Sequence, residues 1–130
     1  MTKKINFFRQ REKEKLESRI KISKDFIQRN TSVSYMNNTK WFELFEYFEE
    51  FKIEFKLKTI LSEELFLCKN IIELESTSIL IDYSENFIEF LEIESVIINN
   101  SSDTIKFLKN NNTKFTIKDS SIEVLGYQLK

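Results

Sequence analysis

The sequence predicts an α+β domain, with helices packed on one face of a mostly antiparallel sheet of about five to six strands. Apolar residues recur at helical spacing in the first fifty residues, and from Phe51 onward they alternate with polar ones. The chain has no proline and one glycine, Gly126, so no Gly- or Pro-rich linker divides it. We therefore expect one domain over residues 1–130, with a basic N-terminal helix and connection at 1–34 and an α+β core at 35–130.

The first predicted element is the basic helix, over residues 3–30. From Ile5 to Ile27, apolar residues recur at helical spacing, and Lys, Arg, Glu and Gln fill most positions between them. The segment Asn30-Thr31-Ser32 interrupts this pattern and is expected to end the helix.

A second helix is predicted to start at Asn37-Asn38-Thr39, whose side chains can accept hydrogen bonds from the free N–H groups of a first helical turn. Glu43, Glu46 and Glu50 lie on one side of this helix, with Tyr47 beside them. The opposite side has apolar residues at i, i+3, i+4 and i+7, which predicts a buried stripe: Trp41, Leu44, Phe45 and Phe48.

The rest of the chain reads mostly as strands. From Phe51 to Lys58, apolar and charged residues alternate, which predicts a strand with one buried face. Two short apolar runs, Leu65–Cys68 and Ile71–Leu74, give weaker strand signals. The remaining predicted elements are a strand at Ile79–Tyr83, a turn at Ser84–Asn86, one long or bulged strand at Phe87–Ile98, a short helix between Ser101 and Asn112, a strand at Phe115–Lys118 and a closing strand at Ile122–Leu129.

The composition argues against most enzyme classes. Without histidine, and with one cysteine and one glycine, the chain cannot build a Ser–His or Cys–His pair, a Cys-rich zinc site or a Gly-rich phosphate loop. We expect no catalytic site, cofactor or bound metal, and we expect Cys68 to be a core thiol. We expect no signal peptide, and no apolar stretch of the sequence is long enough to span a bilayer. Together with the lone cysteine, this predicts a cytoplasmic protein.

Charge is divided unevenly along the chain. Residues 1–40 carry 11 Lys or Arg and 4 Asp or Glu, whereas residues 41–100 carry 4 and 14. A field of one sign attracts a partner of opposite charge and steers its approach. We therefore expect the acidic middle to bind a basic partner protein. The candidate partner-binding residues are Glu43, Glu46, Tyr47, Glu50, Glu73, Glu75, Asp82, Tyr83, Glu85, Glu89 and Glu92.

One sequence box resembles that of a known family. The box is Tyr35-Met36-Asn37-Asn38-Thr39-Lys40-Trp41-x-x-Leu44, and a basic helix precedes it. With the central Ile88-Glu89-Phe90-Leu91 and the late Gly126-Tyr127, it resembles a small bacterial domain family of unknown function, over roughly residues 18–128.

The resemblance implies no known reaction, but small proteins of this kind are found beside bacterial toxins. It therefore suggests an immunity protein that binds and occludes a cognate basic toxin domain, such as a nuclease. The chain also departs from the family pattern. It lacks the Trp- and Pro-bearing middle segments, and it has Glu92, Glu94 and Ser95 where basic residues would be expected.

Other interpretations of the charged residues stay open. The basic helix could bind nucleic acid as a regulatory protein does, or it could pair with the acidic middle, within one chain or between two copies. The protein could accordingly be a monomer or a homodimer. A metal-dependent enzyme would need carboxylates such as Asp82, Glu85 and Glu89, or the pair Glu54-x-Lys56, to act together.

Overall fold

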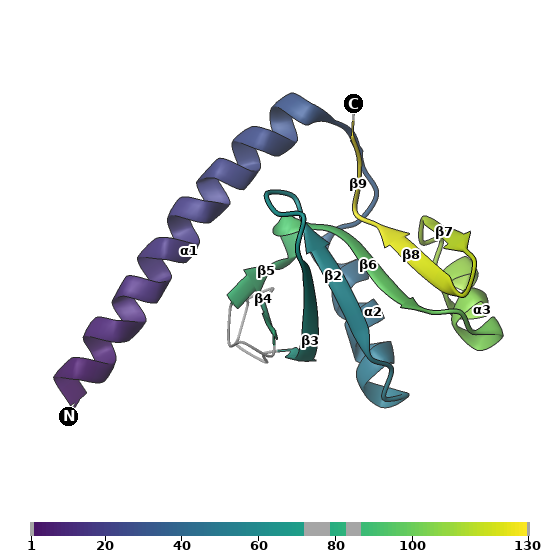
Figure 1. The fold of residues 1–130 in the computed structure, drawn as a ribbon, viewed down its shortest axis with the longest axis horizontal. Coiled ribbons are helices and arrows are strands. Elements are labelled where there is room, and N and C mark those ends of the chain that lie inside the picture. The colour runs from purple at the N-terminus through teal and green to yellow at the C-terminus, as the bar shows by residue number, and fades with distance from the viewer. Residues whose placement is uncertain (1, 72–78, 83–86, 130) are drawn as a thin grey trace.

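The computed structural model describes residues 2–71, 79–82 and 87–129, and the side chains of 14–68 and 88–129 (Figure 1). The described residues confirm an α+β class. The helices are α1 Thr2–Asn30, α2 Asn38–Glu50 and α3 Ser102–Asn110, with a 3-10 turn η1 Phe90–Glu92. The strands are β1 Thr31–Ser34, β2 Phe55–Thr59, β3 Leu65–Ile71, β4 Ile79–Asp82, β5 Phe87–Glu89, β6 Ile93–Asn99, β7 Phe115–Lys118, β8 Ser121–Leu125 and β9 Tyr127–Leu129.

The described strands form two antiparallel sheets. The larger has seven strands in the order β5-β4-β3-β2-β6-β8-β7, and β1 and β9 form a separate two-stranded ribbon. Strand β3 covers the first of the two short runs expected in this region, Leu65–Cys68, and continues to Ile71. The rest of the second run, residues 72–74, lies outside the described residues. The turn expected at Ser84–Asn86 lies outside the described residues.

The larger sheet is strongly curled. Strands β5 and β6 are separated in sequence only by η1, yet β4, β3 and β2 lie between them in the sheet. In a flat sheet the two strands would be about 19 Å apart, whereas four residues span at most about 14 Å. The prediction of one long or bulged strand at Phe87–Ile98 was therefore wrong, because this segment does not form a single strand. It is two strands, with η1 turning the chain from one edge of the curl to its centre (Figure 1).

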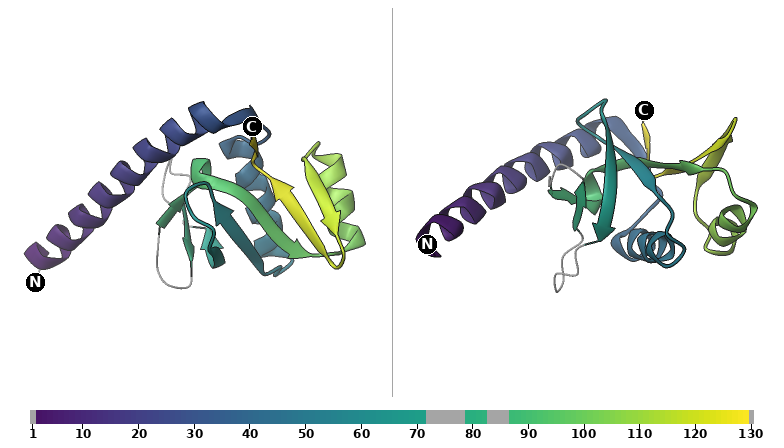
Figure 2. Two further views of the ribbon diagram at one scale, coloured as in Figure 1. Left: turned by 45° about the horizontal axis from the view of Figure 1, so that its top comes forward. Right: turned by 60° about the horizontal axis from the view of Figure 1, so that its bottom comes forward.

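Helix α2 covers one face of this sheet, and α3 lies on the same side (Figure 2). The Asn37 side chain accepts a hydrogen bond from the Lys40 N–H (2.8 Å), so the predicted N-cap is confirmed. All four residues of the predicted stripe are at most 3% exposed. The Phe45 ring lies 5.6 Å from Trp41, 5.1 Å from Phe55 and 5.3 Å from Phe90. Burial of each such side chain stabilises the fold by roughly 1.5–3 kcal/mol.

The strand expected from Phe51 begins four residues later. Helix α2 continues to Glu50, and the chain then turns through Lys52, which has a positive φ of 54°. Phe51 is consequently 58% exposed, although the alternation placed it on the buried face. From Phe55 the prediction is confirmed, because Phe55 and Leu57 are buried and Lys56 is exposed.

The predicted closing strand is divided at Gly126. Here the chain leaves the larger sheet: the Gly126 N–H donates to Glu94 O (2.8 Å), and its carbonyl accepts from the Tyr35 N–H (2.8 Å). A Cβ at this position would lie 2.5 Å from the Ile93 carbonyl oxygen, so only glycine permits the close approach. The break expected at Asn30-Thr31-Ser32 is occupied by β1, which pairs with β9 beyond this glycine.

Candidate protein-interaction surface

The outer side of α2 carries a row of exposed carboxylates. Since the buried stripe occupies the inner side, the exposed residues of the helix after Lys40 are Phe42, Glu43, Glu46, Glu49 and Glu50. None of these glutamates forms an ion pair with a residue that the structure describes. The one cation of the helix, Lys40, donates instead to the Asn112 carbonyl oxygen (3.4 Å).

Two exposed aromatic rings flank this row of carboxylates. Phe42 is 41% exposed near the start of α2, and Phe51 is 58% exposed just after its end. At a rise of 1.5 Å per residue they are separated by roughly 13 Å along the helix axis. We call Phe42, Glu43, Glu46, Glu49, Glu50 and Phe51 together the acidic α2 face. Three of these residues, Phe42, Glu49 and Phe51, were not predicted from the sequence, because the first two lie beside the predicted stripe and the alternation assigned Phe51 to a strand.

Tyr47 was predicted to lie beside the exposed glutamates, but its ring packs against the fold. It is half-buried, and its ring stacks on Phe107 with the centroids 4.0 Å apart and an angle of 15° between the planes. The Phe51 ring lies 4.8 Å from it. Tyr47 therefore holds α2 against α3 and positions Phe51.

Glu92, another candidate binding residue, is buried and paired within the chain. It is 2% exposed, and its carboxylate accepts from Arg19 of α1 through both oxygens, at 2.5 Å from Nε and 3.1 Å from Nη2. The same carboxylate accepts from the Glu89 N–H (2.9 Å) and so holds the first turn of η1. This acid joins α1 to the sheet.

Glu89 lies beside this ion pair and is half-buried. Burial raises its pKa, and the negative charge of Glu92 adds to the effect, whereas Lys24 and Arg19 of α1 oppose it. The nearby Ser23 hydroxyl of α1 is 1% exposed and has no hydrogen-bond partner among the described residues. The basic helix thus pairs with part of the acidic middle within one chain, one of the arrangements left open by the sequence.

Glu94 is likewise engaged within the chain. Lys58 Nζ lies 3.2 Å from Glu94 and 3.3 Å from Glu63, and its hydrogen bonds to these two carboxylates raise the pKa of the lysine. Asp82 lies on β4 opposite Cys68, and its side chain is outside the described set. The other candidate residues, Glu73, Glu75, Tyr83 and Glu85, fall outside the described residues altogether.

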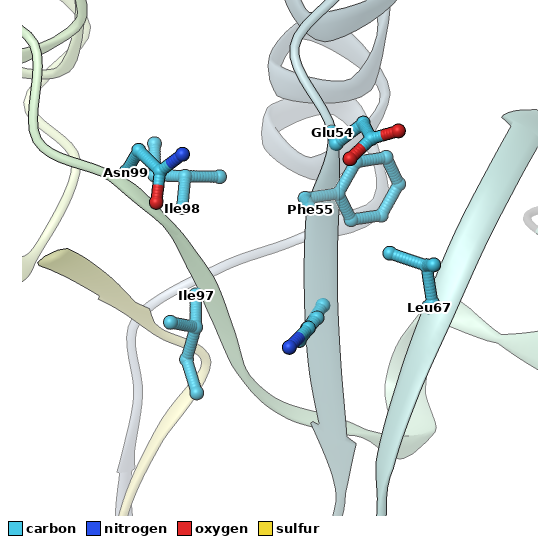
Figure 3. Close-up of a pocket in the computed structure, with 7 residues that line it drawn as sticks. Glu54, Phe55, Leu67, Ile97, Ile98 and Asn99 are labelled. Atoms are coloured by element: carbon cyan, nitrogen blue, oxygen red, sulfur yellow. The ribbon is translucent and has the colours of Figure 1, made fainter.

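A shallow hollow of about 280 Å³ lies on the sheet (Figure 3). Leu67 and Ile97 line it, with Glu54, Lys56 and Asn99 around them. Among the described residues, no group of three or more Cys, Asp or Glu is placed to hold a metal ion. Glu54 and Lys56 both line this hollow with exposed side chains.

The fold and this surface define a small α+β domain with an acidic helix face. The chain belongs to the Family of unknown function (DUF6678), whose match covers residues 23–130. Most of α1, including Arg19, precedes the matched region. No curated protein and no solved structure matches the chain. Within the described residues, no helix is both long and apolar enough to cross a membrane.

Proposed function

We propose that this protein is an immunity protein that binds a basic bacterial toxin domain through the acidic α2 face and occludes its substrate site. The observation that carries the proposal is that α2 presents four exposed carboxylates and, at either end of them, an exposed aromatic ring. None of the four carboxylates has an ion pair among the described residues. Interfaces of this kind use charge for approach and aromatic rings for retention.

The packing of α2 favours a rigid binding surface. The inner stripe of the helix is fixed in the aromatic core, and the Asn37 cap holds its first turn. Carboxylates on such a helix are presented without a large loss of backbone entropy on binding. Opposed fields then raise the association rate, and burial of Phe42 and Phe51 lowers the dissociation rate.

A nuclease is the toxin class that this chemistry fits best. The carboxylates of Glu43, Glu46, Glu49 and Glu50 form a line of negative charge along a helix, as phosphates do along a nucleic-acid strand. A groove that binds phosphates with Lys and Arg would therefore accept this face, and substrate would be excluded. The proposal does not require Glu92 or Tyr47, because both are used inside the fold.

The proposal is tested with two matched triple variants. Glu43→Gln/Glu46→Gln/Glu50→Gln removes three charges from the acidic α2 face. Glu14→Gln/Glu17→Gln/Asp25→Asn removes three exposed charges from α1 as a control. The first step is capture of a basic protein from the native cell at low salt, followed by its expression with and without this chain.

The expected result is that the captured protein stops growth when expressed alone, and that co-expression of the wild-type chain or the α1 control restores growth. The α2 triple variant should fail to restore it and should bind at a rate that no longer falls with added salt. Equal protection by the two triple variants would exclude the acidic α2 face. A captured protein that does not affect growth would exclude the immunity function.

A further inference from the structure

Helix α1 extends well beyond the domain to which it is attached. Its described contacts with the body are concentrated on η1, β5 and β1, and Arg19 makes the ion pair with Glu92. The N-terminal half of the helix projects away from the sheet in every view (Figures 1 and 2). Such a projecting helix is available to another molecule.

The N-terminal part of α1 and helix α2 are opposite in charge. Residues 2–14 carry five Lys or Arg and two Glu, a net charge of +3 over 13 residues. Helix α2 is also 13 residues long and carries four Glu and one Lys, a net charge of −3. Both helices are about 20 Å long, so they can lie side by side along their whole lengths.

These two helices cannot meet within one chain while α1 is docked. Arg19 and Ser23 fix α1 beside η1 and β5, and the helix continues from there away from the body. Helix α2 lies across the sheet from the projecting half in each view (Figures 1 and 2). Charge complementarity between them can therefore act only between two molecules.

We propose that the projecting half of α1 docks on the acidic α2 face of a second copy of this chain. The contact joins a different surface of each molecule, so it closes into a twofold dimer where two copies exchange α1 reciprocally, and otherwise it generates a larger ring or an open chain of copies. It also covers the surface assigned above to the toxin. A second copy and a basic partner then exclude one another on α2.

The test measures the molar mass of the purified protein by sedimentation, over a range of concentrations and at two salt levels. One variant, Arg9→Glu/Arg11→Glu/Lys13→Glu, reverses the charge of the projecting segment. The other, Glu43→Lys/Glu46→Lys/Glu50→Lys, reverses that of α2. Lys106→Glu/Lys109→Glu/Lys118→Glu reverses three exposed lysines elsewhere and is the control. Circular dichroism checks that each variant is folded.

The wild type and the control should self-associate at low salt, with an affinity that falls about tenfold or more as the Debye length drops from about 30 Å to 3 Å. Each charge-reversed variant alone should be monomeric, and an equimolar mixture of the two should associate again, because both pairs of surfaces are then complementary. A mixture that stays monomeric would overturn the inference, as would a wild type that is monomeric at every concentration. Nucleic acid that co-purifies with a monomeric wild type, and is lost with the α1 reversal, would overturn it in favour of nucleic-acid binding.

No partner protein is present in this experiment. Its failure would leave the proposed immunity function standing, and a failure of that function would leave the self-association intact.

Discussion

The acidic residues of α2 and those around η1 look alike in the sequence, but the fold uses them in opposite ways. Glu43, Glu46 and Glu50 are exposed and have no ion pair among the described residues. Glu92 is 2% exposed and is paired with Arg19. The carboxylates of α2 therefore form an exposed surface, whereas Glu92 holds α1 against the sheet. A net charge summed over sixty residues therefore overestimates the charge that a partner can meet.

The largest expected effect is the loss of stability when either member of the Arg19–Glu92 pair is replaced. Arg19→Ala leaves the Glu92 side chain, which is 3% exposed, without its cation, and should lower the free energy of unfolding by about 3 kcal/mol. Glu92→Gln retains an acceptor for the Glu89 N–H and should cost less, about 2 kcal/mol, because the Arg19 side chain is 41% exposed and can regain water. Urea denaturation measures both values. A larger loss for Glu92→Gln than for Arg19→Ala would contradict the assignment of Glu92 as the buried member.

Removing the unsatisfied hydroxyl next to that pair should have the opposite sign. Ser23→Ala deletes a buried oxygen that has no described partner and introduces the best helix former. We expect the free energy of unfolding to rise by about 1 kcal/mol, measured by the same denaturation. Ser18→Ala, at an exposed position of α1, is the matched control and should give only the smaller helix-propensity gain. A loss of stability in Ser23→Ala would mean that the hydroxyl has a role in the junction.

Glu89 provides a test through pH. Its pKa is raised in the fold, mainly by burial, so the folded state binds this proton more tightly than the unfolded chain does. Protonated Glu89 therefore stabilises the folded state relative to the unfolded chain. This stabilisation is fully present below the ordinary carboxyl pKa and is lost as the pH rises through the raised pKa of the folded state. Glu89→Gln should increase the melting temperature by about 1–2 °C at pH 7 relative to wild type. The difference should shrink towards acid pH, and a gain that is independent of pH would argue against this cause.

The smallest effect on stability is expected on α2. Glu43→Gln/Glu46→Gln/Glu50→Gln removes exposed charges that have no ion pair with a described residue, so the free energy of unfolding should change by less than about 0.5 kcal/mol. The measurement is thermal and urea denaturation beside wild type. A loss comparable to that of Arg19→Ala would show that these carboxylates stabilise the fold, and the contrast between the two acidic groups would then fail.

Local patterns in the sequence predicted the parts of the fold that depend on neighbouring residues. The Asn37 cap and the buried side of α2 follow from spacing within one helix, and Phe55 and Leu57 follow from alternation within one strand. The point where α2 ends was missed, because Phe51 fits both a helical and a strand period. The turn at Lys52, where φ is positive, ends the helical segment before the strand begins.

Pairings between distant segments were not predictable in the same way. The partner of Glu92 is 73 residues away, and no periodicity in either segment identifies it. The division of residues 87–98 by η1 depends on the curl of the whole sheet. The residue pattern of this one segment does not indicate that curl. For the candidate surface, the spacing found Glu43, Glu46 and Glu50 but could not show that Tyr47 would be stacked against Phe107.

The β1–β9 ribbon has a consequence for the order in which the protein folds. It pairs Thr31 with Leu129 and Ser34 with Tyr127, whereas β2, β3 and β4 are joined in sequence to the strands beside them. Pairing across such a long loop is slow, because chain entropy is lost before any contact forms. The ribbon is therefore expected to form last. Its amide protons should exchange with solvent sooner than those of β6 and β8, so the link between α1 and α2 would be the first part of the domain to open.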